Sequence, residues 1–332
     1  MRKFLTVLIP LMLIAAPVVY ADGQSVSVYN DFPGGVVING MPVLNTYGNK
    51  VFWVDSNIGS DGNKGTWRRP FATIDYAVGR CTANRGDIIF VKPNHVETVD
   101  SAGDLDLDVA GISVIGLGTG THRPEIRFTG GTSDIDVDAA NITFSGFELT
   151  QLTTASSTLV DVNSADFKMI NNLITESSAL ASTDTIMSDA NADRMVIDGL
   201  TYKGGNATSY WASAQSCINI VGGDDITIRN VNIDGEFAQA AIENVTTAAE
   251  NLKFGGDNQT SYIRNNNYNV IFTAVATTRG FVGPNINSRL HDDAANITEA
   301  FVGADMQFMN PIRIVNADGE SDIEWNGTAS TD

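Results

Sequence analysis

The fold is decided by two stretches of the chain, Ile142-Thr143-Phe144-Ser145-Gly146 and Phe167-Lys168-Met169-Ile170-Asn171. Each opens on an apolar residue, continues as a short β-type run and ends in Gly or Asn, which adopt a left-handed backbone at little steric cost. The pattern recurs at intervals of 30, 25, 28, 31 and 26 residues, and its copies end at Gly116, Gly146, Asn171, Gly199, Asn230 and Gly256. A repeat of this length without helical periodicity predicts a β-solenoid, in which each coil buries its apolar side chains against the next coil.

A second alternating segment precedes each of the first runs and carries carboxylates, as in Leu105-Asp106-Leu107-Asp108 and Ile135-Asp136-Val137-Asp138. Successive side chains of a strand point to opposite faces, so the apolar side chains lie on one face and the carboxylates on the other. The repeat intervals then predict one outward file of acidic side chains, formed by Asp106, Asp136, Asp161 and Asp189. Such a face could supply several of the about six to eight oxygen ligands that Ca²⁺ takes, and a hydrated acidic surface without a fixed metal is the simpler interpretation, because regular strands rarely surround a cation without a loop.

The charge of the chain restricts its partners. Its 332 residues include 39 acidic and 20 basic side chains, which gives a formal net charge of -19. A surface this acidic repels nucleic acid and anionic lipid, so we expect a polysaccharide or surface glycan, a basic protein or a divalent cation as partner, and no nucleic acid. Because a solenoid grows along one axis, we expect one long domain despite the length of the chain.

The first 21 residues have the features of a secretory signal peptide. Arg2 and Lys3 precede a mostly apolar stretch from Phe4 to Val19, and Ala21 completes a small-residue cleavage site. The apolar stretch is short for a membrane-spanning helix, and no later segment is apolar enough to cross a bilayer. We therefore expect an exported chain with no membrane span after cleavage, in which residues 22–50 form an N-terminal extension.

Residues 51–93 contain a distinctive order of elements. The first is a strand, Val51-Phe52-Trp53-Val54-Asp55, and a turn-rich loop from Gly59 to Thr66 follows it. A short helix is expected over residues 70–81, with an apolar face formed by Phe71, Ile74, Ala77, Val78 and Cys81. Gly86-Asp87 then turns into a buried strand, Ile88-Ile89-Phe90-Val91.

The motifs follow one another as a strand, a G-S-D-G-N-x-G loop, a P-F-A-T-I helix and then G-D-x-I-x-V-x-P. This order resembles the opening of right-handed parallel β-helix proteins of the pectin-lyase-like superfamily, including those encoded by tailed bacteriophages. The resemblance covers residues 51–260 and implies an all-β, right-handed parallel β-helix with a short N-terminal capping helix. A cap covers the apolar interior and the unpaired strand edge of the first coil. We expect the β-helix to span residues 51–280, and residues 281–332 to close its far end or to mediate homo-oligomerisation.

The sequence lacks the catalytic signatures of the enzyme branches of that superfamily. It contains no W-x-D-H or R-x-P-x-x-R segment, as pectate lyases do, and no N-T-D with G-H-G, as polygalacturonases do. The remaining catalytic candidates are two weak sets, Asp224 and Asp225 with Arg229, and Asp198 with Lys168 on the adjacent coil. Turn formation and surface ion pairing explain the same residues without any catalysis.

A loop with aromatic residues around it is the best ligand candidate in the sequence. Rings beside amides can stack on sugar faces while the amides bond hydroxyl groups, which singles out Tyr202, Asn206, Tyr210 and Trp211. The same rings could instead pack as a small cluster beneath the loop.

Two functions are compatible with these features. One is an exported structural or carbohydrate-binding β-helix, associated with a cell surface or, as the resemblance implies, a virion. The alternative is a polysaccharide lyase or glycosidase that acts in a groove along the solenoid. The sequence requires no cofactor for either function, and Ca²⁺ on the acidic file is the one candidate.

Overall fold

The structure of the chain is a computed structural model that describes residues 36–38, 41–43, 50–152, 157–176, 182–204, 214–237, 239–244, 246–255, 260–265, 272–283, 285–290, 301–302, 306–308 and 312–315. The chain divides into two units, residues 1–47 and residues 48–332. In the first unit, strands β1 (Val36–Ile38) and β2 (Met41–Val43) pair in antiparallel orientation.

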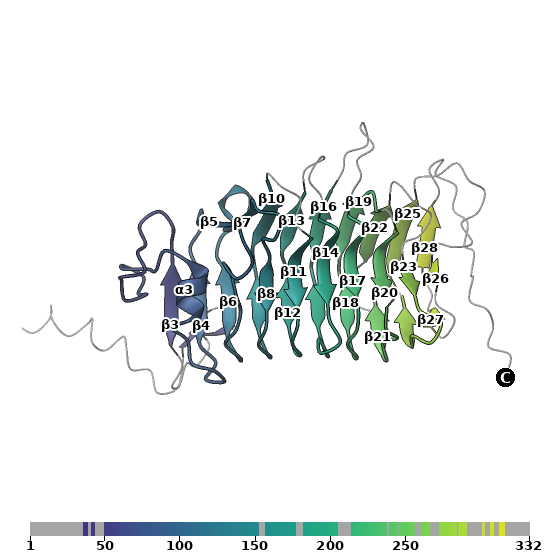
Figure 1. The fold of residues 1–332 in the computed structure, drawn as a ribbon, viewed down its shortest axis with the longest axis horizontal. Coiled ribbons are helices and arrows are strands. Elements are labelled where there is room, and N and C mark those ends of the chain that lie inside the picture. The colour runs from purple at the N-terminus through teal and green to yellow at the C-terminus, as the bar shows by residue number, and fades with distance from the viewer. Residues whose placement is uncertain are drawn as a thin grey trace, which may run out of the picture. The chain divides into compact units, whose positions relative to one another are not determined.

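The second unit consists of three parallel β-sheets through which the chain passes repeatedly (Figure 1). From β6 onward, each strand pairs with the strand three places later in the chain, so every coil contributes one strand to each sheet. All of these pairs are parallel; examples are β9 with β12, β10 with β13, and β11 with β14. This arrangement confirms the predicted parallel β-helix.

The three sheets are named here by number. Sheet 1 has ten strands: β3 (Val51–Val54), β4 (Ile88–Val91), β6 (Ser113–Gly116), β9 (Thr143–Ser145), β12 (Lys168–Ile170), β15 (Val196–Asp198), β18 (Thr227–Arg229), β21 (Leu252–Phe254), β24 (Gly280–Val282) and β27 (Met306–Phe308). Sheet 2 has nine: β5 (Val96–Val99), β7 (Glu125–Phe128), β10 (Glu148–Gln151), β13 (Leu173–Thr175), β16 (Thr201–Lys203), β19 (Asn232–Gly235), β22 (Ser261–Asn265), β25 (Ile286–Leu290) and β28 (Ile312–Val315). Sheet 3 has seven: β8 (Ile135–Val137), β11 (Thr158–Val162), β14 (Asp184–Ser188), β17 (Ser216–Ile220), β20 (Ala240–Asn244), β23 (Phe272–Ala274) and β26 (Phe301–Val302).

The core is a set of apolar ladders that run through the coils. In sheet 3, one ladder places side chains of neighbouring coils directly over one another, and each is at most 1% exposed: Ile135, Val160, Ile186, Ile218, Ile242 and Phe272. Burial of apolar surface contributes about 25 cal/mol per Å², so each rung stabilises its neighbours on both sides. The predicted alternation of apolar residues inward is confirmed.

Four of the six residues of the predicted Gly and Asn column form the corner between sheets 1 and 2 with a left-handed backbone, whereas Gly116 at the end of β6 does not have a left-handed φ. Gly146, Asn171, Gly199 and Asn230 have φ angles of 84°, 53°, 75° and 52°, the left-handed values expected for these residue types. Their backbone N–H groups link coils, since Gly146 donates to Ile170 O at 3.2 Å and Asn171 to Asp198 O at 2.8 Å. Gly256 lies outside the described residues, and in that coil the positive φ of 81° is at Gly255.

A second left-handed column forms the corner between sheets 3 and 1. One residue per coil has a positive φ there: Gly111, Asn141, Asp166, Arg194, Asp225 and Asn251. Each N–H of the first five donates to a carbonyl of the next coil, at distances from 2.7 to 3.0 Å. Five of these six residues are Gly, Asn or Asp, which tolerate a left-handed backbone, and Arg194 is the exception.

The expected helix over residues 70–81 is present in a shorter form, α3 (Ile74–Val78). Phe71 forms a parallel bridge with Val54, which keeps the preceding residues extended. Helix formation starts at Thr73, whose side chain accepts a hydrogen bond from the N–H of Tyr76. The helix packs on β3 and β4, and β3 is the terminal strand of sheet 1 (Figure 1).

The coils continue beyond residue 280, where the sequence placed the end of the β-helix. Strands β25 to β28 pair with β22, β23, β24 and β25 in the same parallel pattern. Here three consecutive polar residues, Asn287, Ser288 and Arg289, interrupt the alternation of apolar and polar residues, and this hides the repeat in the sequence. Within the described residues, no helix combines the length and apolar character that crossing a membrane needs.

We expect substitution of Gly146 by Ala to lower stability by roughly 2–3 kcal/mol, because the new Cβ would lie 2.4 Å from Gly116 O and the φ of 84° is itself unfavourable for Ala. Gly103→Ala is the matched control: its φ is 79°, but no atom lies within 4 Å of the added Cβ. Urea unfolding should show the larger loss for Gly146→Ala. Equal losses would mean that the close contact between coils does not limit stability.

Candidate functional site

Carboxylates line the outer side of sheet 3 near its first strands. Asp136 is in register with Asp106 on one side and with Asp161 on the other, as the sequence predicted. We name these three residues, with Asp134 and Asp138, the acidic face. Neighbouring strands are about 4.8 Å apart, so like charges are held close together by the backbone.

Three oxygens of the acidic face are buried without a hydrogen-bond donor. They are Oδ1 of Asp106, Oδ1 of Asp134 and Oδ1 of Asp161. A buried acceptor without a donor is unfavourable, more so when it carries charge. Protonation of a carboxylate removes its charge and turns one oxygen into a donor, so the acidic face favours bound protons.

Burial raises the pKa of each of these three carboxyl groups from 3.8 to about 6. Nearby negative charge adds to the effect of burial, chiefly from Asp108 at Asp106 and from Asp136 at both Asp134 and Asp161. The pKa of Asp136 is also raised, by burial and then by Asp138. Near neutral pH the acidic face is therefore an unfavourable accumulation of negative charge.

The fourth predicted member of the file, Asp189, is not in line with the other three. Asp161 is in register with Met187, and Asp189 lies two residues further along. The connection between β14 and β15 has two more residues than the one between β11 and β12, and the repeat interval read from sheet 1 therefore misaligns sheet 3. In the described part of the chain, no three His, Cys, Asp or Glu side chains are arranged to hold a metal ion, so we assign no calcium site.

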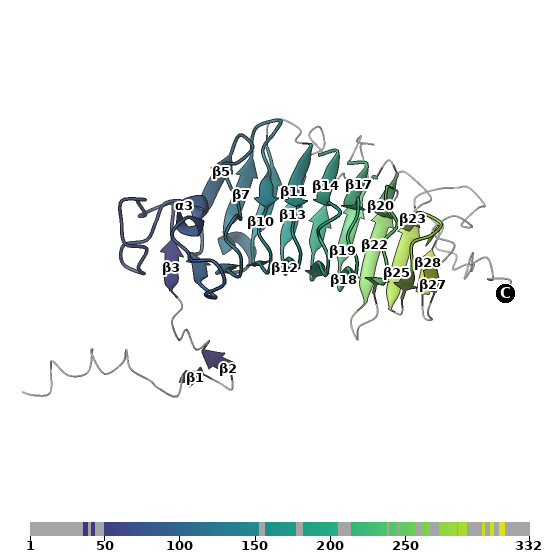
Figure 2. The same cartoon turned by 60° about the horizontal axis from the view of Figure 1, so that its bottom comes forward.

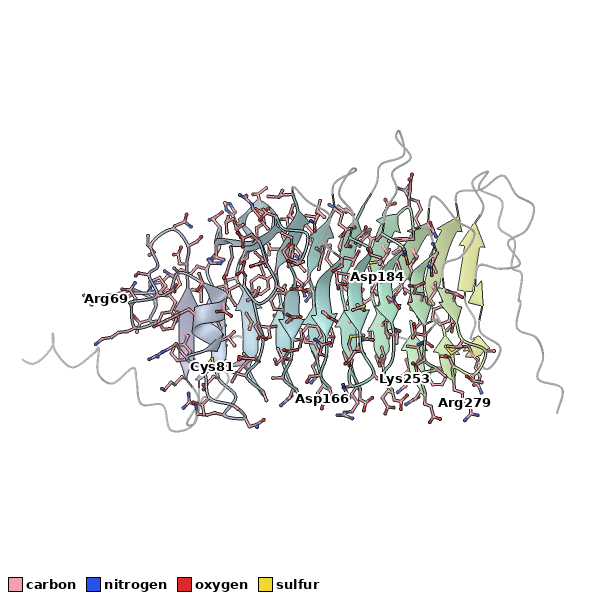
Figure 3. The ribbon with its side chains drawn as sticks, viewed as in Figure 1. Arg69, Cys81, Asp166, Asp184, Lys253 and Arg279 are labelled. Carbon is pink, nitrogen blue, oxygen red and sulfur yellow. The ribbon has the colours of Figure 1, made fainter. Side chains whose placement is uncertain are left out.

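Further along sheet 3 lies a second polar cluster that the sequence did not indicate. Asp184 accepts hydrogen bonds from Ser216 Oγ at 2.9 Å and Asn219 Nδ2 at 3.1 Å (Figure 3). Glu243 is in register with Asn219, and burial followed by the charge of Asp184 raises its pKa from 4.5 to about 7. Glu243 Oε2 and Asn219 Oδ1 are both buried without a partner, and protonation of Glu243 would supply the missing donor.

The outer side of sheet 2 carries a shallow depression of about 470 Å³, which we name the sheet-2 groove. It crosses several coils and is lined by uncharged residues: Asn171, Gly199, Thr201, Asn230, Val231, Asn232, Thr260 and Tyr262. Thr201, Asn232 and Tyr262 are in register on β16, β19 and β22. The side chain of Tyr262 is 53% exposed, so its ring is available to a ligand.

The groove follows from the left-handed column at the corner between sheets 1 and 2. Asn171, Gly199 and Asn230 belong to that column, and a Cβ on Gly199 would lie 2.3 Å from Asn171 Oδ1. A larger residue would therefore fill the depression. Thr201 and Asn232 lie two residues after Gly199 and Asn230 of this column, at outward positions that the sequence pattern does not single out, and Tyr262 is in register with them on the next coil.

Of the four residues predicted for an aromatic ligand site, Tyr202 does not face the solvent. Tyr202 is fully buried, and its hydroxyl donates to Glu176 Oε2 at 2.6 Å inside the solenoid. The backbone register explains this, since Tyr202 lies between Ile174 and Ile233, which are both buried. The other three candidates, Asn206, Tyr210 and Trp211, lie outside the described residues.

The two weak catalytic sets are arranged differently from the prediction. Asp198 accepts a hydrogen bond from Arg229 Nε at 3.0 Å, whereas Lys168 is in register with Val196. Asp224 Oδ1 accepts from the N–H of Glu250 at 2.8 Å, and Asp225 Oδ1 accepts from Asn251. The two aspartates thus stabilise turns between coils, and Arg229 forms a surface ion pair with Asp198.

No known protein family and no curated protein matches this sequence. Among solved structures, the chain is similar to a rhamnogalacturonan lyase at 14% sequence identity and a TM-score of 0.34, over 84% of this chain and 90% of that chain. The parallel strand pairing establishes the fold without this similarity. The three-sheet parallel β-helix is the architecture that the resemblance to the pectin-lyase-like superfamily implies.

We expect Asp161→Asn to raise the melting temperature by roughly 2–4 °C at pH 7.5 and to have little effect at pH 4. The folded chain binds this proton more tightly than the unfolded chain, because the folded pKa of about 6 exceeds the unfolded value. The stabilisation is complete below about pH 4 and is lost as the pH rises through 6. Thermal unfolding of variant and parent across this range measures the difference.

Asp166→Asn is the control with the opposite sign. Arg194 binds the Asp166 carboxylate at 2.7 Å and lowers its pKa. Asp166→Asn should therefore lower the melting temperature at pH 7.5 and leave it almost unchanged at low pH. If the melting temperatures of Asp161→Asn and Asp166→Asn changed with pH in the same direction relative to the parent, the assignment of bound protons to the acidic face would be wrong.

Proposed function

We propose that this chain is an exported β-helix that binds a neutral polysaccharide or surface glycan in the sheet-2 groove. The observation that carries the proposal is the half-exposed ring of Tyr262 in a groove lined by amides, hydroxyls and glycine, with no charged side chain. Aromatic rings stack on the apolar faces of sugars, and amide and hydroxyl groups bond the sugar hydroxyls.

The spacing of the groove residues suits a repeating ligand. Thr201, Asn232 and Tyr262 lie on three successive strands of sheet 2, so their backbones are about 4.8 Å apart from one coil to the next. A chain of sugars lying across the coils would meet a new polar or aromatic group on each strand. The rigid backbone keeps these groups in place before the ligand arrives, which reduces the ordering needed on binding.

The groove favours binding without turnover. Glycoside hydrolysis uses two carboxyl groups on either side of the scissile bond, and lyase chemistry needs a base beside the sugar. The groove lining contains neither, and the negative charge of the chain favours a neutral glycan over an acidic one. A structural role on a cell or virion surface is compatible with this binding function.

The alternative function is a glycosidase or lyase on the acidic face. One observation favours it: Asp134, Asp136 and Asp161 are close together and have raised pKa values, which is the property that a general acid needs at neutral pH. Incubation with neutral and acidic glycans, with and without Ca²⁺, separates the two functions. New reducing ends or unsaturated products would establish the enzyme instead of the binding protein.

We expect Tyr262→Ala to weaken binding of neutral glycans by about tenfold or more, through loss of the stacking surface. Tyr262→Phe keeps the ring and should retain most of the affinity, and Asn232→Ala should give an intermediate loss. Leu152→Ala is the control, since Leu152 is 40% exposed beside sheet 2 and does not line the groove. Titration calorimetry with glycans selected from a panel measures these affinities. Unchanged affinity in Tyr262→Ala would exclude the groove.

The proposed export of the chain predicts that its signal peptide is cleaved. When the full chain is produced in a bacterial host, the exported product should begin at Asp22, because cleavage after Ala21 removes the apolar segment. Intact-mass measurement of the exported fraction checks this. A product that keeps residues 1–21, or one found only inside the cell, would contradict export by cleavage.

A further inference from the structure

The N-terminal end of the solenoid has a charge opposite to that of the rest of the chain. Residues 50–92 contain seven basic and four acidic side chains, whereas the whole chain has a net charge of -19. Three of the basic residues, Lys64, Arg68 and Arg69, are exposed in one loop together with Trp67. We name these four residues the basic tip.

The basic tip is a fixed structure. Thr66 and Arg69 form two reciprocal backbone hydrogen bonds of 3.0 Å, and the N–H of Trp53 on β3 donates to Gly65 O at 2.8 Å. The indole of Trp67 meets that of Trp53 edge-on at 4.7 Å, and Lys92 Nζ lies 4.3 Å from the Trp67 ring. The fold thus holds Trp67 in place while 55% of its side chain stays exposed.

The positive charges of the tip are not used inside the fold. Lys92 pairs with Asp55 at 3.3 Å and Arg85 with Asp87, whereas Lys64, Arg68 and Arg69 form no salt bridge within the described residues. Arg69 lies at the end of the unit that β3 occupies, away from the coils (Figure 3). Figure 2 shows from a second direction that the tip loop extends beyond the strands. An exposed ring among unpaired cations suits an acidic peptide that also carries apolar side chains.

The chain itself contains such a peptide. Residues 316–332 follow β28 and include no basic residue. Two large apolar residues, Ile323 and Trp325, lie among five acidic ones: Asp318, Glu320, Asp322, Glu324 and Asp332. We propose that the basic tip of one copy binds residues 316–332 of a second copy, so that copies associate head to tail.

A second copy is a better source of this segment than the same copy. In sheet 1, β3 and β27 are the two end strands of ten. At about 4.8 Å per interval, β3 and β27 are about 43 Å apart. Seventeen residues span about 58 Å when fully extended, so a copy reaches its own tip only with a nearly straight segment along an acidic body. A neighbouring copy requires no such extension. Head-to-tail contact is heterologous, and it therefore builds rings or open chains rather than closed dimers.

Sedimentation velocity of the full chain tests the proposal. We expect association that increases with protein concentration in 50 mM NaCl and is strongly reduced in 500 mM NaCl, since exposed charge pairs are screened by salt. The double variant Arg68→Glu/Arg69→Glu should remain monomeric at concentrations at least tenfold higher than the parent. The matched control is Lys168→Glu/Lys203→Glu, which makes the same change of charge at two exposed lysines of the coils and should associate like the parent.

A charge exchange tests the identity of the occupant. Asp322→Lys/Glu324→Lys should abolish association on its own and restore it when mixed with Arg68→Glu/Arg69→Glu. A fluorescent peptide of residues 316–332 gives an independent measure: it should bind the parent, bind at least tenfold more weakly to the tip variant, and lose affinity when Trp325 is replaced by Ala. Far-UV circular dichroism of each variant shows whether the fold is intact.

Three results would overturn the proposal. The first is association that the tip variant leaves unchanged, which would place the contact elsewhere. The second is a chain that stays monomeric at every concentration although the free peptide binds the tip, which would mean that each copy binds its own segment. The third is a peptide that binds parent and tip variant equally. None of these results bears on glycan binding in the sheet-2 groove, which lies on other residues.

Discussion

The structure depends on parallel backbone pairing that places each coil directly over the previous one. Because the backbone fixes the register, residues at equivalent positions become neighbours about 4.8 Å apart whether or not their side chains attract each other. For Ile135, Val160 and Ile186 this produces a continuous apolar ladder. For Asp106, Asp136 and Asp161 the same pairing holds like charges together, and the raised pKa values are its consequence.

The fold could be predicted because its two requirements leave marks in the sequence. Inward positions must be apolar, and the corner between sheets 1 and 2 favours residues that tolerate a positive φ, such as Gly146 and Asn171. The second corner carries the same mark at Gly111, Asn141 and Asp166, and Arg194 is the exception that meets the same backbone requirement. The last coils were missed because polar residues such as Asn287, Ser288 and Arg289 interrupt the repeat.

The candidate site was harder to predict, for two physical reasons. A repeat interval measured on one sheet does not hold on another when a connection changes length, and two additional residues after β14 moved Asp189 out of line with Asp161. Burial also depends on which face of a strand a residue occupies. Tyr202 lies between Ile174 and Ile233 and is buried, whereas Tyr262 pairs with Asn232 on the outer side and is half exposed. Both tyrosines are equally conspicuous in the sequence, and only the strand register distinguishes them.

The three outer surfaces differ in charge because the fold leaves outward side chains free to vary. The core restricts inward residues to apolar types, so selection for interaction can act only on outward positions and loops. On sheet 2 the positions that line the groove around Tyr262 are neutral, on sheet 3 the positions around Asp136 are acidic, and beside β3 the loop around Trp67 is basic. Because the surfaces differ in charge, they do not compete for the same partner. An anionic partner is attracted to the basic tip and repelled by the acidic face, whereas a neutral glycan is attracted electrostatically to neither. A rigid scaffold with long, separate faces can therefore carry several interactions at fixed distances along one chain.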